Sequence, residues 1–271
     1  MQNMEASVTT DEQKRYLAFA AVLFTQNGHL SEELEISDKM KCKNILKRWW
    51  GIEDHSEAAK TAEKLSIAAT HTPFADDVYS EFIVKGRRPP SSPEDLADLT
   101  GLENAYRSSV RRALYMADVP DEEITPEYVE ELMAQDGYTA TFTEVLFDRL
   151  IEGLECYQQA KDVLKRAGVS DEEMSEIKTL AAWDYGRTGI IARYGANAGY
   201  LDEDEAWHHM KTAAENAAGI YPGWREYFAA YILGRAVALG ADCKDQYSTM
   251  NYLLNNEYES PVFRVSFKQM G

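Results

Sequence analysis

Apolar residues recur through most of this chain at the 3.6-residue spacing of an α-helix, and this periodicity constrains the fold more than any other feature. The segment after Asp11 is typical, because its apolar residues share one helical face and Asn27-Gly28 then supplies a left-handed stop. No strong run of β-branched alternation competes with this pattern. We therefore predict an all-α fold whose helices pack around one core.

Further helices are predicted where a capping residue precedes an apolar period and a glycine or proline follows it. Ser170 and Glu173 have the spacing of a capping box and should open one of them. Residues 262–267 are expected as either a short strand or an extended tail. The main predicted helices cover residues 11–24, 41–50, 57–70, 102–117, 143–166, 202–218 and 224–239.

The chain has 271 residues, which is enough for one large domain or two small ones. Its only proline-rich stretch, Gly86 to Pro93, predicts an exposed loop and the edge of an insertion. We predict a single compact multi-helix domain over residues 1–271, with a helical insertion at about 73–165. The most distinctive part of its core lies at about 170–240.

The formal net charge is −18 and the sequence pI is about 4.7, which disfavours nucleic acid as a partner. The strongest local basic set has mixed helical phases, and we interpret it mostly as a solvated face: Lys39, Lys41, Lys43, Lys47 and Arg48. The negative electrostatic field of the whole chain is compatible with a basic protein partner and would speed the encounter of the two proteins.

Much of the acid is concentrated at predicted helix starts, in residues 121–136, 171–176 and 202–205. It can form a recognition patch, or it can cap helices and keep the chain soluble. We favour the second interpretation. The acidity therefore permits a basic partner without requiring one.

The beginning of the chain lacks the basic and apolar regions of a secretory leader, and no apolar run is long enough to cross a bilayer. The three cysteines are far apart, odd in number and without C-x-x-C spacing, as expected for buried free thiols. We therefore expect a cytoplasmic protein that does not bind membranes. The sequence does not fix its oligomeric state.

The standard motifs for phosphate, dinucleotide, metal and nucleophile chemistry are absent from the sequence. Glu205 and His208 match one Glu-x-x-His element of a di-iron bundle, but a second such element is missing. We therefore predict no metal, no cofactor and no catalytic residue.

A group of polar and aromatic residues in the C-terminal half offers the best candidate for a functional site. Asp184 and Arg187 stand at i,i+3 on one predicted helix, so their side chains can meet. The favoured interpretation is a buried structural pair; the sharper one is a pocket that binds an anion. The candidate residues for this pocket or polar core are Asp184, Arg187, Arg193, Tyr200, Glu205, Trp207, Trp224, Tyr231 and Arg235.

Several short motifs occur in this region in a fixed order: Trp183-Asp184-x-x-Arg187, Arg193-Tyr194-Gly195, Gly199-Tyr200-Leu201, Glu203-x-Glu205-Ala206-Trp207, Trp224-x-Glu226-Tyr227-Phe228 and Tyr231-x-x-Gly234-Arg235. Together they resemble the signature of a bacterial family of domains of unknown function, with small enterobacterial paralogues. The resemblance is specific over residues 181–240 and looser over 46–70, around Trp50-Gly51-Ile52. It does not cover residues 73–165 or the tail after Asp242.

The resemblance implies that the genes of relatives lie in accessory bacterial gene neighbourhoods, some of them near toxin or secretion systems. It favours a non-enzymatic protein-binding protein of immunity or adaptor type, with an acidic surface. The alternative is an enzyme or a binder of small anionic ligands, with a pocket around Asp184, Arg187, Arg193 and Arg235. A third possibility is an oligomeric scaffold.

Overall fold

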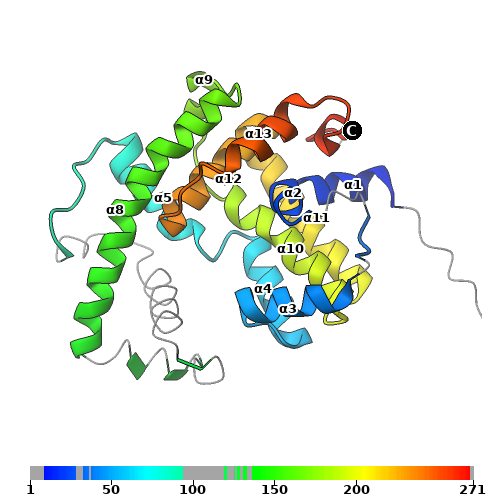
Figure 1. Cartoon of the computed structure of the whole chain (residues 1–271), viewed down its shortest axis with the longest axis horizontal. Helices are drawn as coiled ribbons and strands as arrows, with labels where there is room; N and C mark the ends of the chain where they lie inside the picture. The colour runs from blue at the N-terminus through cyan, green and yellow to red at the C-terminus, as the bar shows by residue number, and fades with distance from the viewer. Residues whose placement is uncertain are drawn as a thin grey trace, which may run out of the picture. The chain divides into compact units, whose positions relative to one another are not determined.

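A computed structural model describes residues 9–28, 33–36, 38–93, 119–120, 125, 127–128, 131–132 and 136–268. These residues form eleven α-helices, one π-helix and one 3₁₀ helix, and no strand occurs among them (Figure 1). The predicted all-α class is confirmed. The predicted helix at 102–117 and most of the acidic segment at 121–136 lie outside the described residues.

The chain divides into two compact units. Unit 1 comprises residues 1–67, 184–228 and 248–271, and unit 2 comprises residues 68–183 and 229–247. The region predicted as an insertion, 73–165, falls inside unit 2. That it is an insertion into a single domain stays a prediction.

Unit 1 contains helices from both ends of the chain and from its C-terminal half. Helix α11 packs against both α1 and α4, and α1 also contacts η4. The elements that lie wholly or mostly in this unit are α1 (Asp11–Ala18), α2 (Ala21–Gln26), α3 (Lys39–Trp50), α4 (His55–Ser66), α10 (Ala182–Ala198), α11 (Glu203–Ile220), α13 (Gln246–Asn255) and η4 (Pro261–Phe263).

Local capping explains where the first helices of unit 1 begin and end. Gly51 ends α3 with a φ of 64°, as predicted. The segment predicted as one helix at 11–24 is two helices, α1 and α2, separated at Phe19 and Ala20. Helix α4, predicted at 57–70, begins earlier because the side chain of Asp54 accepts a hydrogen bond from the backbone N–H of Glu57.

The tail after α13 is not a strand, so the strand alternative for residues 262–267 is wrong. Residues 261–263 form the 3₁₀ helix η4, and the tail then follows an irregular path. Its carbonyl groups accept hydrogen bonds from side chains rather than from a neighbouring strand. Trp224 Nε1 donates to the carbonyl of Val265 over 3.2 Å, and Arg15 Nη1 donates to that of Phe267 over 3.1 Å.

Unit 2 is built around the long helix α8 (Asp136–Arg166), whose predicted beginning at residue 143 was too late. The C-terminal part of α12 (Trp224–Leu239) packs closely on it, because a Cβ at Gly153 would lie only 2.7 Å from the carbonyl oxygen of Val237. The other elements of the unit are α5 (Thr72–Val78), the π-helix η1 (Tyr79–Val84) and α9 (Asp171–Ser175).

The predicted capping box at the start of α9 is confirmed. The backbone N–H of Glu173 donates to Ser170 Oγ, and the backbone N–H of Ser170 donates to the Glu173 carboxylate. The predicted loop at 86–93 is irregular and largely exposed. Both features follow from local sequence, which is why short patterns suffice to predict them.

All three cysteines are buried free thiols. Burial raises the pKa of the Cys243 thiol to about 11, so it is protonated at neutral pH. Across the part of the chain that the structure describes, no helix has both the length and the apolar character required to span a bilayer.

Candidate functional site

Asp184 and Arg187 form a buried ion pair on α10. Asp184 is fully buried and Arg187 is 5% exposed, and Nη2 of the arginine donates to Oδ1 of the aspartate. The guanidinium carbon also lies 5.5 Å from the ring centre of Trp50 on α3. The structure therefore brings two of the predicted residues together in the interior of unit 1.

Arg193, six residues further along α10, donates hydrogen bonds to backbone carbonyls. Its Nε donates to the carbonyl of Leu34 over 3.2 Å, and Nη2 lies 3.5 Å from the carbonyl of Glu35. Asn197 adds to this contact, because its amide donates to Leu34 O and its Oδ1 accepts from the N–H of Ile36. We name Arg193 and Asn197 the α10 clamp. Desolvation by burial lowers the pKa of Arg193 to about 10.

Tyr200, Trp207 and Trp224 also belong to unit 1, but they have separate neighbours. Lys43 Nζ lies 5.5 Å from the ring centre of Tyr200. Trp207 Nε1 donates to the Glu203 carboxylate over 3.1 Å. Trp224 joins a cluster of aromatic rings at the start of α12, formed with Phe19, Tyr227, Phe228 and Phe267.

Tyr231 and Arg235 lie on the part of α12 that belongs to unit 2. The rings of Tyr231 and Trp183 meet edge to face with centroids 5.0 Å apart. Arg235 Nη1 donates to the carbonyl of Asp242 over 2.9 Å. The nine predicted residues are therefore divided between the two units, with these two in unit 2.

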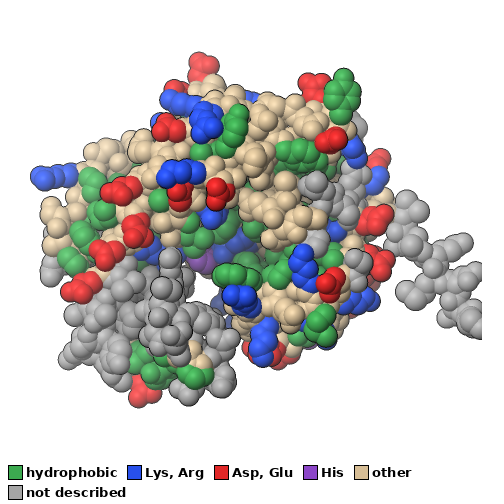
Figure 2. Space-filling model, in the orientation of Figure 1, with side chains coloured by type: hydrophobic (Ala, Val, Ile, Leu, Met, Phe, Trp, Pro, Cys, Tyr) green, Lys and Arg blue, Asp and Glu red, His purple; other side chains and the backbone are tan. Residues whose placement is uncertain are grey.

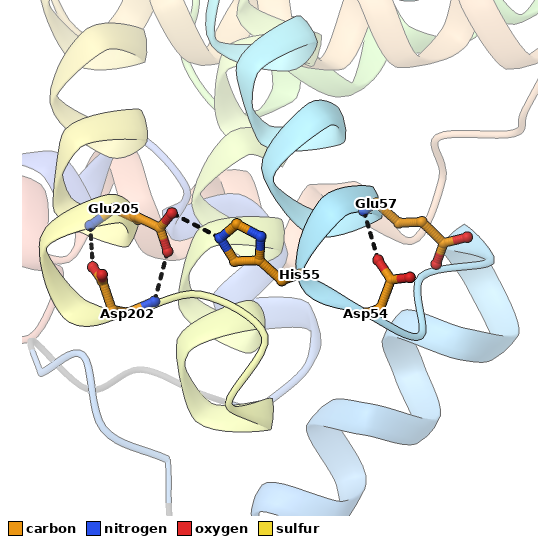
Figure 3. Close-up of polar contacts among 5 residues, drawn as sticks. All are labelled: Asp54, His55, Glu57, Asp202 and Glu205. Atoms are coloured by element: carbon orange, nitrogen blue, oxygen red, sulfur yellow. Dashed lines mark hydrogen bonds and ion pairs between the residues drawn. The ribbon is translucent and has the colours of Figure 1, made fainter.

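Glu205 joins the first turns of two helices at the surface of unit 1 (Figure 3). One oxygen accepts from the backbone N–H of Asp202 over 2.9 Å, while Asp202 Oδ1 accepts from the N–H of Glu205 over 2.8 Å, which completes a capping box for α11. The other oxygen, Oε1, lies 2.8 Å from His55 Nε2 at the start of α4.

The contact between His55 and Glu205 favours the charged form of each side chain. The hydrogen bond and charge of Glu205 raise the pKa of His55, and the pKa of Glu205 is lowered first by the Asp202 backbone and then by His55. The Glu-x-x-His spacing placed His208 near Glu205 in the sequence, but the histidine that Glu205 contacts is His55, 150 residues away. The described residues contain no group of three or more side chains suited to hold a metal ion.

Helix α3 presents a second surface feature, a shallow hollow of about 330 Å³ along its exposed side. Trp49 at its end is 71% exposed and Met40 is 64% exposed, and the guanidinium carbon of Arg48 lies 5.3 Å from the ring centre of Trp49. We name this the α3 surface, and it is lined by Asp38, Met40, Lys41, Asn44, Ile45, Arg48 and Trp49.

Helix α3, which carries this surface, is basic within an acidic chain, and the lining itself contains Lys41 and Arg48 beside the capping carboxylate of Asp38. The twelve residues of α3 include five Lys or Arg and no Asp or Glu. In Figure 2, acidic and basic side chains are mixed over the face shown. The buried side of the helix contains Cys42 and Leu46. Met40 falls out of phase with them, whereas Trp49 lies seven residues after Cys42 and falls in phase, so helical spacing alone does not predict its exposure.

The comparisons with known proteins agree with the family resemblance seen in the sequence but correct its extent, because the match also spans residues 73–165 and continues past Asp242. A family model described as "Protein of unknown function (DUF1266)" matches residues 45–267. The chain is 33% identical over 86 residues to the Escherichia coli (strain K12) protein "Uncharacterized protein YbeU", which covers 32% of this chain and 37% of YbeU. It is 38% identical over 56 residues to "Uncharacterized protein YbeR" of the same organism, covering 21% of this chain and 24% of YbeR. No solved structure matches.

Proposed function

Because the chain belongs to the DUF1266 family, whose description assigns no function, we propose one from the surface chemistry of the chain itself. We propose a non-enzymatic binding protein of adaptor or immunity type that contacts a protein partner through the α3 surface. The observation that carries this proposal is the exposure of Trp49, 71%, beside Arg48 and a hollow of about 330 Å³.

An exposed tryptophan is costly in water and valuable at an interface. Tryptophan and arginine are the residues most enriched among those that dominate binding energy in protein complexes. Covering the exposed area of Trp49 would contribute on the order of 3 kcal/mol before the costs of association. Trp49 and Arg48 are adjacent at the end of α3, which gives a partner both an apolar and a polar contact.

The contacts of the arginines support the α3 surface over the anion-binding pocket. Arg187 pairs with Asp184, Arg193 donates to backbone carbonyls of Leu34 and Glu35, and Arg235 donates to the carbonyl of Asp242. Each of these three guanidinium groups therefore already forms hydrogen bonds within the chain. An acidic face that binds a basic partner, expected from the net charge of −18, stays a prediction, and the α3 surface is not that face.

The adaptor or immunity type rests on the gene neighbourhoods implied by the sequence resemblance. The matched segments span 37% of YbeU and 24% of YbeR, and neither protein's name states an activity. An immunity protein works by binding and blocking a toxin, so its function needs an interface and no reaction. That requirement fits a chain whose distinctive surface feature is an exposed aromatic beside basic side chains.

The proposal is tested by replacing Trp49 with the photo-crosslinking residue benzoylphenylalanine in the full chain, in the native host. Tyr258, which is 91% exposed in the same unit, is the matched control position. We expect a discrete adduct from position 49 and none from 258, and the purified partner should bind wild type about 30-fold more tightly than Trp49→Ala. Equal adducts from both positions, or no adduct from position 49, would overturn the proposal.

A further inference from the structure

We propose that the occupant of the α3 surface is a short acidic segment of a protein partner. An apolar side chain of this segment enters the hollow, and its carboxylates lie against Lys41 and Arg48. This inference rests on the proposed function and deepens it by naming the chemistry of the partner. The opposite charge of α3 relative to the rest of the chain carries it.

The basic side chains of α3 differ in what they already contact. Lys47 pairs with Glu53 over 2.8 Å, and Lys43 lies over the ring of Tyr200. Within the described part of the chain, Lys39, Lys41 and Arg48 form no ion pair. Lys39 and Lys41 are exposed near the start of the helix, and Arg48 is exposed near its end. Of these three, Lys41 and Arg48 line the hollow, seven residues apart on one side of the helix, and the Asp38 carboxylate at its start is held by the backbone N–H of Lys41. The hollow therefore presents two cations and one capping carboxylate.

A short segment fits this surface better than an extended polyanion does. At physiological ionic strength charges act over about 8 Å, whereas a helix of twelve residues is about 18 Å long. A segment that touches only α3 therefore meets the local positive field. A membrane or a nucleic acid would also approach the rest of the chain, which would repel it. The net charge of the whole chain is −18, and without the basic residues of α3 the remainder is more negative still.

The hollow gives the segment an apolar anchor point. Its volume of about 330 Å³ is at the lower end of the range for small-molecule pockets, so it accommodates a few side-chain atoms rather than a folded element. Met40, Ile45 and Trp49 supply apolar lining. Methionine adapts to differently shaped partners, and the aromatic ring of Trp49 offers a rigid wall.

The test is a selection of random displayed peptides, as long as the twelve residues of α3, on the full-length protein. Peptides that also bind the Trp49→Ala variant are removed by counter-selection. We expect the recovered peptides to be acidic and to contain at least one large apolar residue. Recovery of basic or uncharged peptides, or no enrichment at all, would overturn the inference.

A synthetic copy of the most enriched peptide then gives the affinities by fluorescence anisotropy. We expect Trp49→Ala to weaken binding about 30-fold and Lys41→Glu/Arg48→Glu to weaken it at least about 10-fold. The matched control is Lys60→Glu/Lys64→Glu on α4, which makes the same charge change at exposed positions and should leave binding within about 2-fold. Circular dichroism checks that all variants remain folded.

Two further outcomes separate this inference from the proposed function. If the partner crosslinked at position 49 contacts it through a basic or uncharged segment, the proposed function stands and the acidic segment is wrong. If vesicles of phosphatidylglycerol bind wild type but not Lys41→Glu/Arg48→Glu, a membrane surface replaces the peptide as the occupant. Binding of the acidic peptide without vesicle binding supports the inference.

Discussion

The ring of Phe267 meets the ring of Trp224 edge to face, with centroids 4.9 Å apart and an angle of 86° between their planes. The ring centre of Phe267 also lies 5.2 Å from that of Phe19, so the tail after η4 contributes a ring to the core of unit 1. It is 7% exposed, in contrast to Phe263 four residues earlier, which is 47% exposed. The tail is therefore a packing element of this unit.

We predict that Phe267→Ala lowers the free energy of unfolding by about 3 kcal/mol, because the substitution leaves a cavity among aromatic rings. Urea denaturation followed by circular dichroism measures this change. Phe263→Ala is the control and should change the free energy by less than about 0.5 kcal/mol. Similar losses in both variants would show that the tail is not packed as described.

Gly189→Ala should destabilise the protein by about 2 kcal/mol. A Cβ at position 189 would collide with the Cβ of Ala20, which is fixed to its backbone and cannot rotate away. Gly219→Ala on α11 is the matched control, because a Cβ there meets nothing within 4 Å. The control should be neutral or slightly stabilising, since alanine favours helices. The midpoint of thermal unfolding is measured for both variants. An unchanged midpoint for Gly189→Ala would contradict the close contact between positions 189 and 20.

Asp184→Asn should lower the free energy of unfolding by about 3 kcal/mol or more, because it leaves the buried charge of Arg187 without its carboxylate. The double substitution Asp184→Leu/Arg187→Met removes both charges and keeps similar volumes. It should therefore be much less destabilising than the single change. Chemical denaturation compares the two, and equal losses would mean that shape rather than charge governs this position.

Folding should raise the pKa of His55 above its ordinary value of 6.5, through the hydrogen bond and charge of Glu205. The stabilisation that comes from protonated His55 is then fully present below 6.5 and is lost as the pH rises through the raised pKa. NMR titration of the histidine ring measures this, and Glu205→Gln should return the pKa towards 6.5. An ordinary His55 pKa in wild type would disprove the pair in solution.

His209 provides an internal comparison in the same titration. Burial lowers its pKa from 6.5, so its contribution has the opposite sign: stability is present above 6.5 and is lost as the pH falls through the lowered pKa. The two histidines should therefore titrate on opposite sides of the ordinary value.

The sequence predicted those parts of the fold that depend on neighbouring residues. Gly51 ends α3, Ser170 opens α9, and α12 has the predicted limits of 224 and 239, because caps and apolar periods act within one or two turns. The helix over Gln246–Asn255 was missed, and α4, predicted from residue 57, begins at His55 because Asp54 caps it.

The candidate site was predictable to a smaller degree. The contact of Asp184 with Arg187 follows from their spacing on one helix, whereas the partner of Arg193 is the backbone of a segment about 160 residues away. Periodicity does not predict such a long-range contact. The exposure of Trp49 also depends on which side of α3 is buried, and only packing against the rest of unit 1 fixes that.

The α10 clamp has an evolutionary consequence. Arg193 and Asn197 bind the carbonyl of Leu34, and they also meet the carbonyl of Glu35 and the N–H of Ile36, groups that every residue other than proline provides. Substitutions at 34 and 35 can therefore accumulate among relatives without loss of these hydrogen bonds. The two residues on α10 have no such freedom, since few other side chains offer the same donors and acceptors. Divergence should consequently be fast in the segment that is held and slow in the residues that hold it.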